Sequence, residues 1–150
     1  MSDFEREIVN CLNRFFKVKQ VQGFAFRLKP QRSATTCADV LADSSIPEYN
    51  LSIECKSIID KKLYFSQHFH TGKQTIHPVD AISEFLAKTG RVGYLAIEFR
   101  QETGKASEAF LVPWMTVVEH FRKNQGISLD NARNFIEFGH SRDGYILEDL

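Results

Sequence analysis

The stretch "NLSIECKS", Asn50 to Ser57, constrains this chain more than any other part of it. Apolar and polar side chains alternate along it with the period of a β-strand, which predicts that Leu51, Ile53 and Cys55 share the buried face. Glu54 and Lys56 must then lie together on the opposite face. Such a pair is either a weak surface ion pair or two groups supplied to a functional site, and this stretch alone leaves both readings open.

Hydrophobic periodicity along the rest of the chain predicts the element order α-β-β-β-α-β-β-α. The first three strands should form an antiparallel run. The apolar run at residues 92–100 follows a helix that follows a strand, which is typical of a buried crossover strand in a mixed sheet. Residues 58–76 are predicted to be a long functional loop or partly extended, and the chain after residue 126 to be irregular. The expected helices and strands are residues 3–17, 21–28, 37–42, 50–57, 78–89, 92–100, 109–113 and 113–126.

Length and composition indicate one α/β domain over residues 1–150, with 43% hydrophobic residues. The three cysteines, Cys11, Cys37 and Cys55, are odd in number and lack C-x-x-C spacing, so we expect small core residues in a reducing compartment. The N-terminus is charged from its third residue, and no apolar run approaches the ~18 residues of a membrane span. We therefore expect an intracellular, cytoplasmic protein with no membrane partner.

Basic side chains gather in two parts of a chain whose charges balance at 19 each. Residues 14–36 contain no acidic residue, and residues 56–77 contain a single one, Asp60. This distribution is compatible with one phosphate-facing side, although a charge run is more often a solvated face. The candidate DNA-binding residues in these runs are Arg27, Lys29, Arg32, Lys61, Lys62 and Lys73.

Carboxylates are the most promising chemical groups, because the common hydrolase, nucleotide-binding and zinc-protease motifs are absent. Asp39 lies in the strand before that of Glu54, and neighbouring strands would bring Asp39, Glu54 and Lys56 together. Two hard oxygen ligands and one cation suit Mg²⁺, which Mn²⁺ can replace, with the backbone carbonyl of Cys55 as a further ligand. The competing reading of Glu54 and Lys56 is an exposed surface pair.

A third carboxylate comes from the first helix. On a helical projection Glu5 falls inside the apolar stripe, whereas Glu7 lies outside it. A carboxylate turned toward the protein needs a partner, which a metal or its bound water could supply. A capping box with Ser2 is the alternative, since the two residues have the right spacing.

Other aromatic and histidine residues permit both functional and structural readings. His68, His70 and His77 could form a zinc cluster or contact phosphate and solvent. A basic and aromatic segment could stack on DNA bases or pack the loop onto the domain; its aromatic members are Tyr64, Phe65 and Phe69. A later set could be core or a dimer interface; it comprises Trp114, Phe121, Phe135 and Phe138.

Six segments, in order, resemble the Holliday junction resolvases of the PD-(D/E)xK nuclease superfamily. They are "FEREIVNCL", "GFAFR", "SATTCADVLA", "LSIECKS", "VDAISEFLAKTGRVGYLAIEFR" and "AFLVPW", and the resemblance covers roughly residues 3–113. The resemblance implies a restriction-endonuclease-like fold, a central mixed sheet flanked by helices. It also implies a metal site of Glu5, Asp39 and Glu54, a catalytic Lys56 and a phosphate or active-site contact at Ser33.

The sequence departs from the pattern of these families at two positions. Ala38 stands where the superfamily's name has a proline, which these resolvases often lack. Asp80 stands where the bacterial type suggests a glutamine, so no role is transferred to that position.

These observations together predict a Mg²⁺-dependent endonuclease acting on branched DNA, most simply four-way junctions. The alternatives are a restriction or repair nuclease on duplex DNA and a non-catalytic DNA-binding module with the same fold. A homodimer is expected, because resolution of a junction needs two nicks and one active site cuts one strand at a time.

Overall fold

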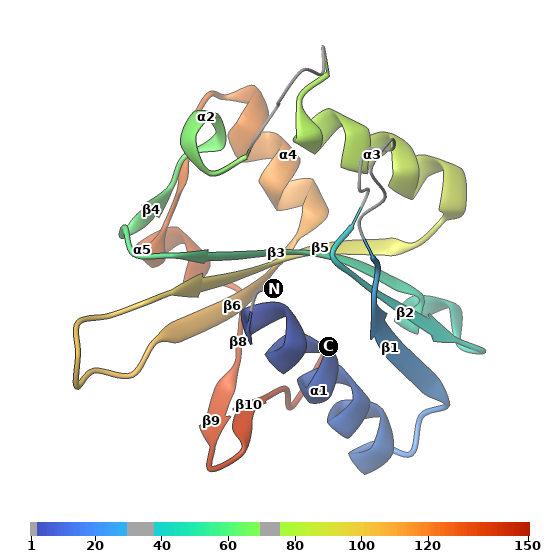
Figure 1. Ribbon diagram of the computed structural model, residues 1–150. Coiled ribbons are helices and arrows are strands. Elements are labelled where there is room, and N and C mark those ends of the chain that lie inside the picture. Colours follow the sequence, from blue (N-terminus) through green and yellow to red (C-terminus); the bar gives the residue numbers. More distant parts are fainter. Residues whose placement is uncertain (1–2, 30–37, 70–75) are drawn as a thin grey trace.

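A central six-stranded sheet organises the computed structural model, which describes residues 3–29, 38–69 and 76–150. Helix α1 covers one face of this sheet, and helices α3 and α4 lie over the other (Figure 1). In spatial order the strands are β1 (Gly23–Arg27), β2 (Val40–Ser44), β3 (Leu51–Ile58), β5 (Val92–Phe99), β6 (Glu108–Pro113) and β8 (Ile136–Glu137).

Strands β1, β2 and β3 are antiparallel neighbours, as the sequence predicts. Strand β3 then pairs in parallel with β5, with Glu54 opposite Leu95 and Ser57 opposite Glu98. Strands β5, β6 and β8 continue antiparallel. The parallel pair confirms the predicted crossover strand, because the connection between β3 and β5 contains helix α3.

Three helices make the two outer layers, and α1 and α3 have local signals for their ends. Helix α1 spans Asp3–Val18, with acidic residues in its first turn and Lys17 in its last. Helix α3 spans Pro78–Thr89; the imidazole of His77 accepts a hydrogen bond from the Val79 N–H at its start, and Gly90 ends it at φ 73°. Helix α4 spans Trp114–Arg122.

The remaining elements are short. A 3₁₀ turn covers Pro47–Tyr49, helix α2 covers Phe65–His68 and helix α5 covers Leu129–Ala132. Two small sheets accompany them: β4 (Lys62–Leu63) with β7 (Ile127–Ser128), and β9 (Gly139–Ser141) with β10 (Gly144–Ile146). No helix in the described ranges is long and apolar enough to cross a membrane.

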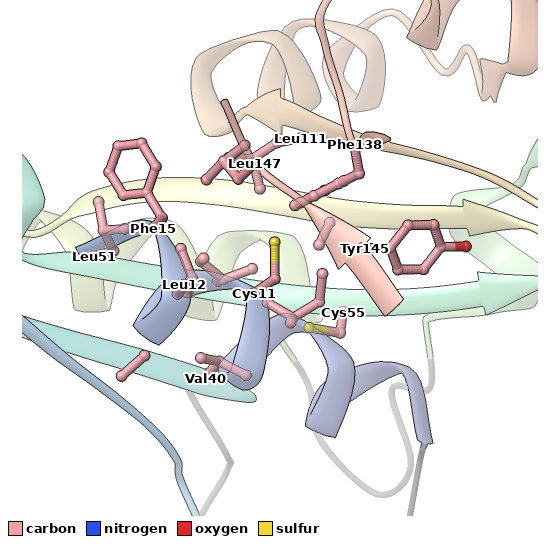
Figure 2. Close-up of a cluster of buried hydrophobic side chains, with 14 of the residues drawn as sticks. Cys11, Leu12, Phe15, Val40, Leu51, Cys55, Leu111, Phe138, Tyr145 and Leu147 are labelled. Atoms are coloured by element: carbon pink, nitrogen blue, oxygen red, sulfur yellow. The ribbon is translucent and has the colours of Figure 1, made fainter. Parts of the chain in front are cut away.

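Two hydrophobic cores lie on opposite faces of the sheet. The first packs α1 against the sheet and includes Leu51, Ile53 and Cys55, which confirms the buried face predicted for this strand (Figure 2). The second core lies beneath α3 and α4 and includes Ile58 and Phe69. Strand β3 therefore contributes to both cores, with its charged side chains toward the α3 side.

Two sequence predictions need correction. Helix α2 occupies part of the region predicted to be a loop or partly extended, whereas strand β4 agrees with the partly extended alternative. The region after residue 126 is not irregular, since it contains β7, α5, β8, β9 and β10. Strand β8 is only Ile136–Glu137, too short for alternation to reveal, and becomes a sheet strand because β6 pairs with it.

Candidate active site

Asp39 and Glu54 meet where strands β2 and β3 stop pairing. The last paired residues are Val40 and Ile53. Beyond them the Asp39 N–H donates to Ile53 O at 3.1 Å, and Asp39 Oδ2 accepts from the Cys55 N–H at 2.8 Å. The side chain of Asp39 thus takes over a hydrogen bond from the backbone of β3, which fixes its carboxylate beside Glu54.

The two carboxyl groups share a hydrogen bond, and Glu54 is partly buried. Burial, followed by the hydrogen bond and the charge of Asp39, raises the pKa of Glu54 well above its usual range. The ionised form of Glu54 is therefore disfavoured beside Asp39. A divalent cation could offset this unfavourable charge.

Lys56 follows on the same face of β3, as the alternation predicts. Its Nζ lies 4.5 Å from the centre of the Phe69 ring. Its positive charge lowers the pKa of Glu54, but by less than burial and Asp39 raise it. Within the described residues no ion pair involves Lys56. The ammonium group is therefore near the carboxyl pair without being bound to it.

Glu5 on α1 is the third carboxylate, and it has a partner of its own. Its Oε2 accepts from Arg27 Nη2 at 2.6 Å and from Arg27 Nε at 3.1 Å. The charge of Glu5 is close enough to contribute to the raised pKa of Glu54. The sequence predicted a metal or its bound water as the partner of this inward-facing carboxylate, whereas the structure gives it Arg27. The capping alternative depends on Ser2, outside the described residues.

The donor set fits a hard divalent cation that keeps several waters. Asp39 and Glu54 supply two carboxyl groups, and the Cys55 carbonyl lies between Glu54 and Lys56 in sequence. In the described part of the chain, no group of three or more histidine, cysteine, aspartate or glutamate side chains is arranged to hold a metal ion. Two carboxylates completed by water and substrate oxygens suit Mg²⁺, which rarely uses an all-protein cage.

Comparisons with known proteins support the architecture around this site. No protein-family model matches the chain, and no curated protein matches its sequence. The structure is similar to that of Hjc, a Holliday junction resolvase from the archaeal hyperthermophile Archaeoglobus fulgidus, with a TM-score of 0.56 and 20% sequence identity. The match covers 89% of this chain and 93% of that one.

The fold is that of a Holliday junction resolvase. This finding confirms the predicted restriction-endonuclease-like fold, a mixed sheet flanked by helices. It also agrees with the order of the segments that carry the sequence resemblance.

The resolvase fold places the predicted DNA-binding residues in different surroundings. Lys29 and Lys61 are exposed. Lys62 lies with its Nζ 5.7 Å from the centre of the Tyr64 ring, and Arg27 is engaged with Glu5. Three other predicted residues, Arg32, Ser33 and Lys73, lie outside the described residues.

The histidines are used within the protein. His68 Nδ1 accepts from the Tyr64 N–H at 2.8 Å, and its Nε2 lies 3.2 Å from Asp60 Oδ2. Both nitrogens of His77 are also occupied, one by the Val79 N–H and the other by Phe65 O. These contacts indicate structural roles for both residues. His70, the third member of the proposed zinc set, lies outside the described residues.

The aromatic candidates divide by burial. Phe65 and Phe69 are buried, which supports the packing reading, whereas Tyr64 is exposed. Trp114 and Phe138 are buried in the two cores, as the simpler reading predicts.

One polar cluster was not predicted from the sequence, and it lies on the opposite face of β3 from Glu54 and Lys56. Glu98 on β5 accepts hydrogen bonds from Ser57 Oγ at 2.6 Å and from the Tyr145 hydroxyl at 2.5 Å. Burial and the charge of Glu98 raise the pKa of the nearby Glu7. The available signal was a single glutamate inside the apolar run at residues 92–100, which could have marked a buried carboxylate.

Proposed function

We propose that this protein is a metal-dependent endonuclease that hydrolyses phosphodiester bonds in branched DNA, as a Holliday junction resolvase. The observation that carries the proposal is the Asp39–Glu54 carboxyl pair near the ammonium group of Lys56, at the point where β2 and β3 stop pairing on a resolvase fold. Such an enzyme would act on DNA inside the cell, in recombination and repair.

Asp39, Glu54 and the Cys55 carbonyl would hold Mg²⁺ or Mn²⁺, with Glu5 nearby as an additional carboxylate. The bound metal would polarise the phosphodiester and lower the pKa of a water molecule. Lys56 can donate hydrogen bonds to the attacking water and to a phosphate oxygen, which offsets the charge that develops in the transition state. Asp39 also fixes the backbone at Cys55 through its 2.8 Å hydrogen bond.

Arg27 would bring DNA to this site. Glu5 accepts from its Nε and from one terminal nitrogen, and no contact with another described residue occupies the second terminal nitrogen, which could meet a phosphate oxygen. Other phosphate contacts are proposed at Lys29, Arg32, Ser33, Lys61, Lys62 and Lys73. If these contacts are made, affinity should fall steeply as salt rises, whereas an affinity indifferent to NaCl would contradict them.

The activity test uses three DNA substrates, a four-way junction, a flap and a linear duplex, each with Mg²⁺, with Mn²⁺ or with EDTA. We expect metal-dependent nicks near the branch point of the junction and little cleavage of the duplex. Preferential cleavage of duplex DNA would favour the restriction or repair alternative. Binding of DNA without cleavage under any metal condition would favour the non-catalytic module.

We also propose that the active form is a homodimer. Two copies related by a two-fold axis would present two sites to a junction that is itself nearly two-fold symmetric. Light scattering after size exclusion should then give about twice the 17.2 kDa mass of the chain. A protein that stays monomeric on junction DNA would instead point to a nuclease that nicks one strand.

A further inference from the structure

We propose that Phe69 is a positioning residue for Lys56, whose ammonium group its aromatic ring holds in place. The inference rests on the function proposed above and gives Phe69 a role other than the DNA stacking or loop packing predicted from the sequence. It begins with one contact, the 4.5 Å separation between Lys56 Nζ and the centre of the Phe69 ring. That separation is within the ~6 Å over which a ring attracts a cation.

The ring is the partner that the structure gives to the Lys56 ammonium. Among the described residues, the side chain of Lys56 takes part in no hydrogen bond or ion pair, although Glu54 lies on the same face of β3. An aromatic face attracts the charge without using an N–H donor in a conventional hydrogen bond. The donors of Lys56 therefore remain available for water and phosphate.

The Phe69 ring is itself held firmly. It is 3% exposed and stacks on Phe65 with a centroid distance of 5.7 Å and an interplanar angle of 27°. The His77 ring lies on it at 5.8 Å, and Phe65 packs edge-on against Phe121 at 5.3 Å. A ring held by two aromatic neighbours, one of which is itself packed on Phe121, is a preorganised support for a flexible side chain.

His77 fastens this support to helix α3. Its Nδ1 accepts from the Val79 N–H at 3.1 Å, so its Nε2 carries the proton and donates to Phe65 O at 3.2 Å. The turn at α2 is thereby joined to the start of α3. Phe69 follows α2 directly and is positioned by the same connection.

The Phe69 ring can restrain Lys56 without occupying a carboxylate that the proposed metal needs. A lysine side chain loses rotamer entropy when it is fixed. If it were fixed by an ion pair with Glu54, that carboxylate would be occupied when a metal needed it. A neutral ring can restrain the ammonium group near the phosphate and leave both Asp39 and Glu54 for the cation.

The kinetic test compares substitutions of Phe69 with a matched change at Phe65. Phe69→Leu keeps an apolar side chain but removes the aromatic face, and we expect kcat on junction DNA to fall about tenfold with KM within about twofold. Phe69→Tyr and Phe69→Trp keep the aromatic face and should retain most of kcat. Phe65→Leu disturbs the same cluster without touching Lys56 and should lower thermal stability more than kcat.

Equal losses of kcat in Phe69→Leu and Phe65→Leu, or no recovery in either aromatic variant, would overturn the proposal. A large rise in KM in Phe69→Leu would also overturn it, because positioning of Lys56 should affect turnover rather than DNA binding.

A measurement without DNA separates this inference from the proposed function. In the NMR spectrum of the wild-type protein, the ring current of Phe69 should shift the ε-methylene protons of Lys56 upfield. The shift should disappear in Phe69→Leu and persist in Phe65→Leu; its absence in the wild type would overturn the inference. If the shift is present but the wild type cleaves no DNA, the proposed function fails while the contact between Lys56 and Phe69 stands.

Discussion

Two glutamates on the adjacent strands β3 and β5 are both partly buried, yet their surroundings differ in kind. Glu98 accepts hydrogen bonds from two neutral hydroxyl groups, those of Ser57 and Tyr145. Glu54 instead faces the carboxyl group of Asp39, and burial together with this neighbour raises its pKa. The hydroxyl donors stabilise the ionised form of Glu98. The ionised form of Glu54 would be stabilised by a cation that offsets the neighbouring carboxyl group.

The Glu98 cluster joins parts of the fold that are distant in sequence. Tyr145 on β10 bonds Glu98 and packs edge-on against Phe4 of α1 at 6.0 Å, and its side chain borders the core in Figure 2. The hydrogen bond from Ser57 adds β3 to the same network. The comparison teaches that a carboxylate satisfied by hydroxyl donors contributes to stability, while one set against another carboxylate lowers stability unless a cation joins the pair.

The largest expected effect is a difference in DNA cleavage between variants of Glu54 and a variant of Glu98. Glu54→Gln and Asp39→Asn should each lower junction cleavage by about 100- to 1,000-fold, because each removes a charged ligand of the proposed metal. Glu98→Gln, the matched control, should keep cleavage within a few-fold at a temperature where it is folded. DNA binding, measured by fluorescence anisotropy in Ca²⁺ or EDTA, should survive in all three. Undiminished cleavage by Glu54→Gln would remove the basis of the comparison.

The next largest expected effect is a loss of stability when the Glu98 side chain is removed. Glu98→Ala leaves the hydroxyl groups of Ser57 and Tyr145 without their acceptor, so we expect a loss of about 2–3 kcal/mol in the free energy of unfolding. Urea titration followed by circular dichroism measures this loss. Tyr145→Phe removes one of the two donors and should cost less. A neutral effect of Glu98→Ala would show that the cluster is not a structural tie.

Glu5 could act in cleavage, as predicted for Glu54, or in stability, as predicted for Glu98. It has a cationic partner in Arg27 and is also near Glu54. We expect Glu5→Gln to lower cleavage about tenfold, a smaller loss than for Glu54→Gln, since it would remove a supporting carboxylate and not a principal ligand. Single-turnover cleavage rates and thermal melting should be measured on the same preparation. A change in melting temperature alone would place Glu5 with Glu98.

The smallest expected effect is a gain in stability, in Glu54→Gln. The pKa of Glu54 is raised in the folded state, so its ionised form is disfavoured there, and the resulting penalty grows as pH rises above the unfolded value of about 4.3. In EDTA at neutral pH, Glu54→Gln should therefore be more stable than the wild type by on the order of 1 kcal/mol. The difference should vanish toward pH 4.

Thermal melts across this pH range measure the effect, and Mg²⁺ should stabilise the wild type more than Glu54→Gln. Stabilisation by Glu98→Gln under the same conditions would contradict the distinction between the two glutamates.

Local patterns in the sequence were sufficient for much of the fold. The amphipathic stripe predicts α1 nearly to its last residue, and Pro78 and Gly90 mark the ends of α3. The alternation in "NLSIECKS" places Glu54 and Lys56 on the same face of β3. These features are carried by residues close together in the chain, so period and end signals are enough to reveal them.

The sequence also predicted that Asp39 and Glu54 would meet, because consecutive antiparallel strands are usually neighbours. Asp39 and Glu54 converge because of a strand order that the sequence pattern already suggested. The pattern did not reveal that Asp39 accepts a hydrogen bond from the Cys55 N–H, since that contact arises where the regular pairing ends.

Only the tertiary structure decided the partners of these groups. Glu5 meets Arg27 across 22 positions of sequence, and Tyr145 meets Glu98 across 47. The Phe69 ring reaches Lys56 because α2 folds back over the α3 side of the sheet. Period and propensity assign a side chain to a face, but the group it meets there depends on how separate elements pack, and that arrangement is set by the whole core rather than by neighbouring residues.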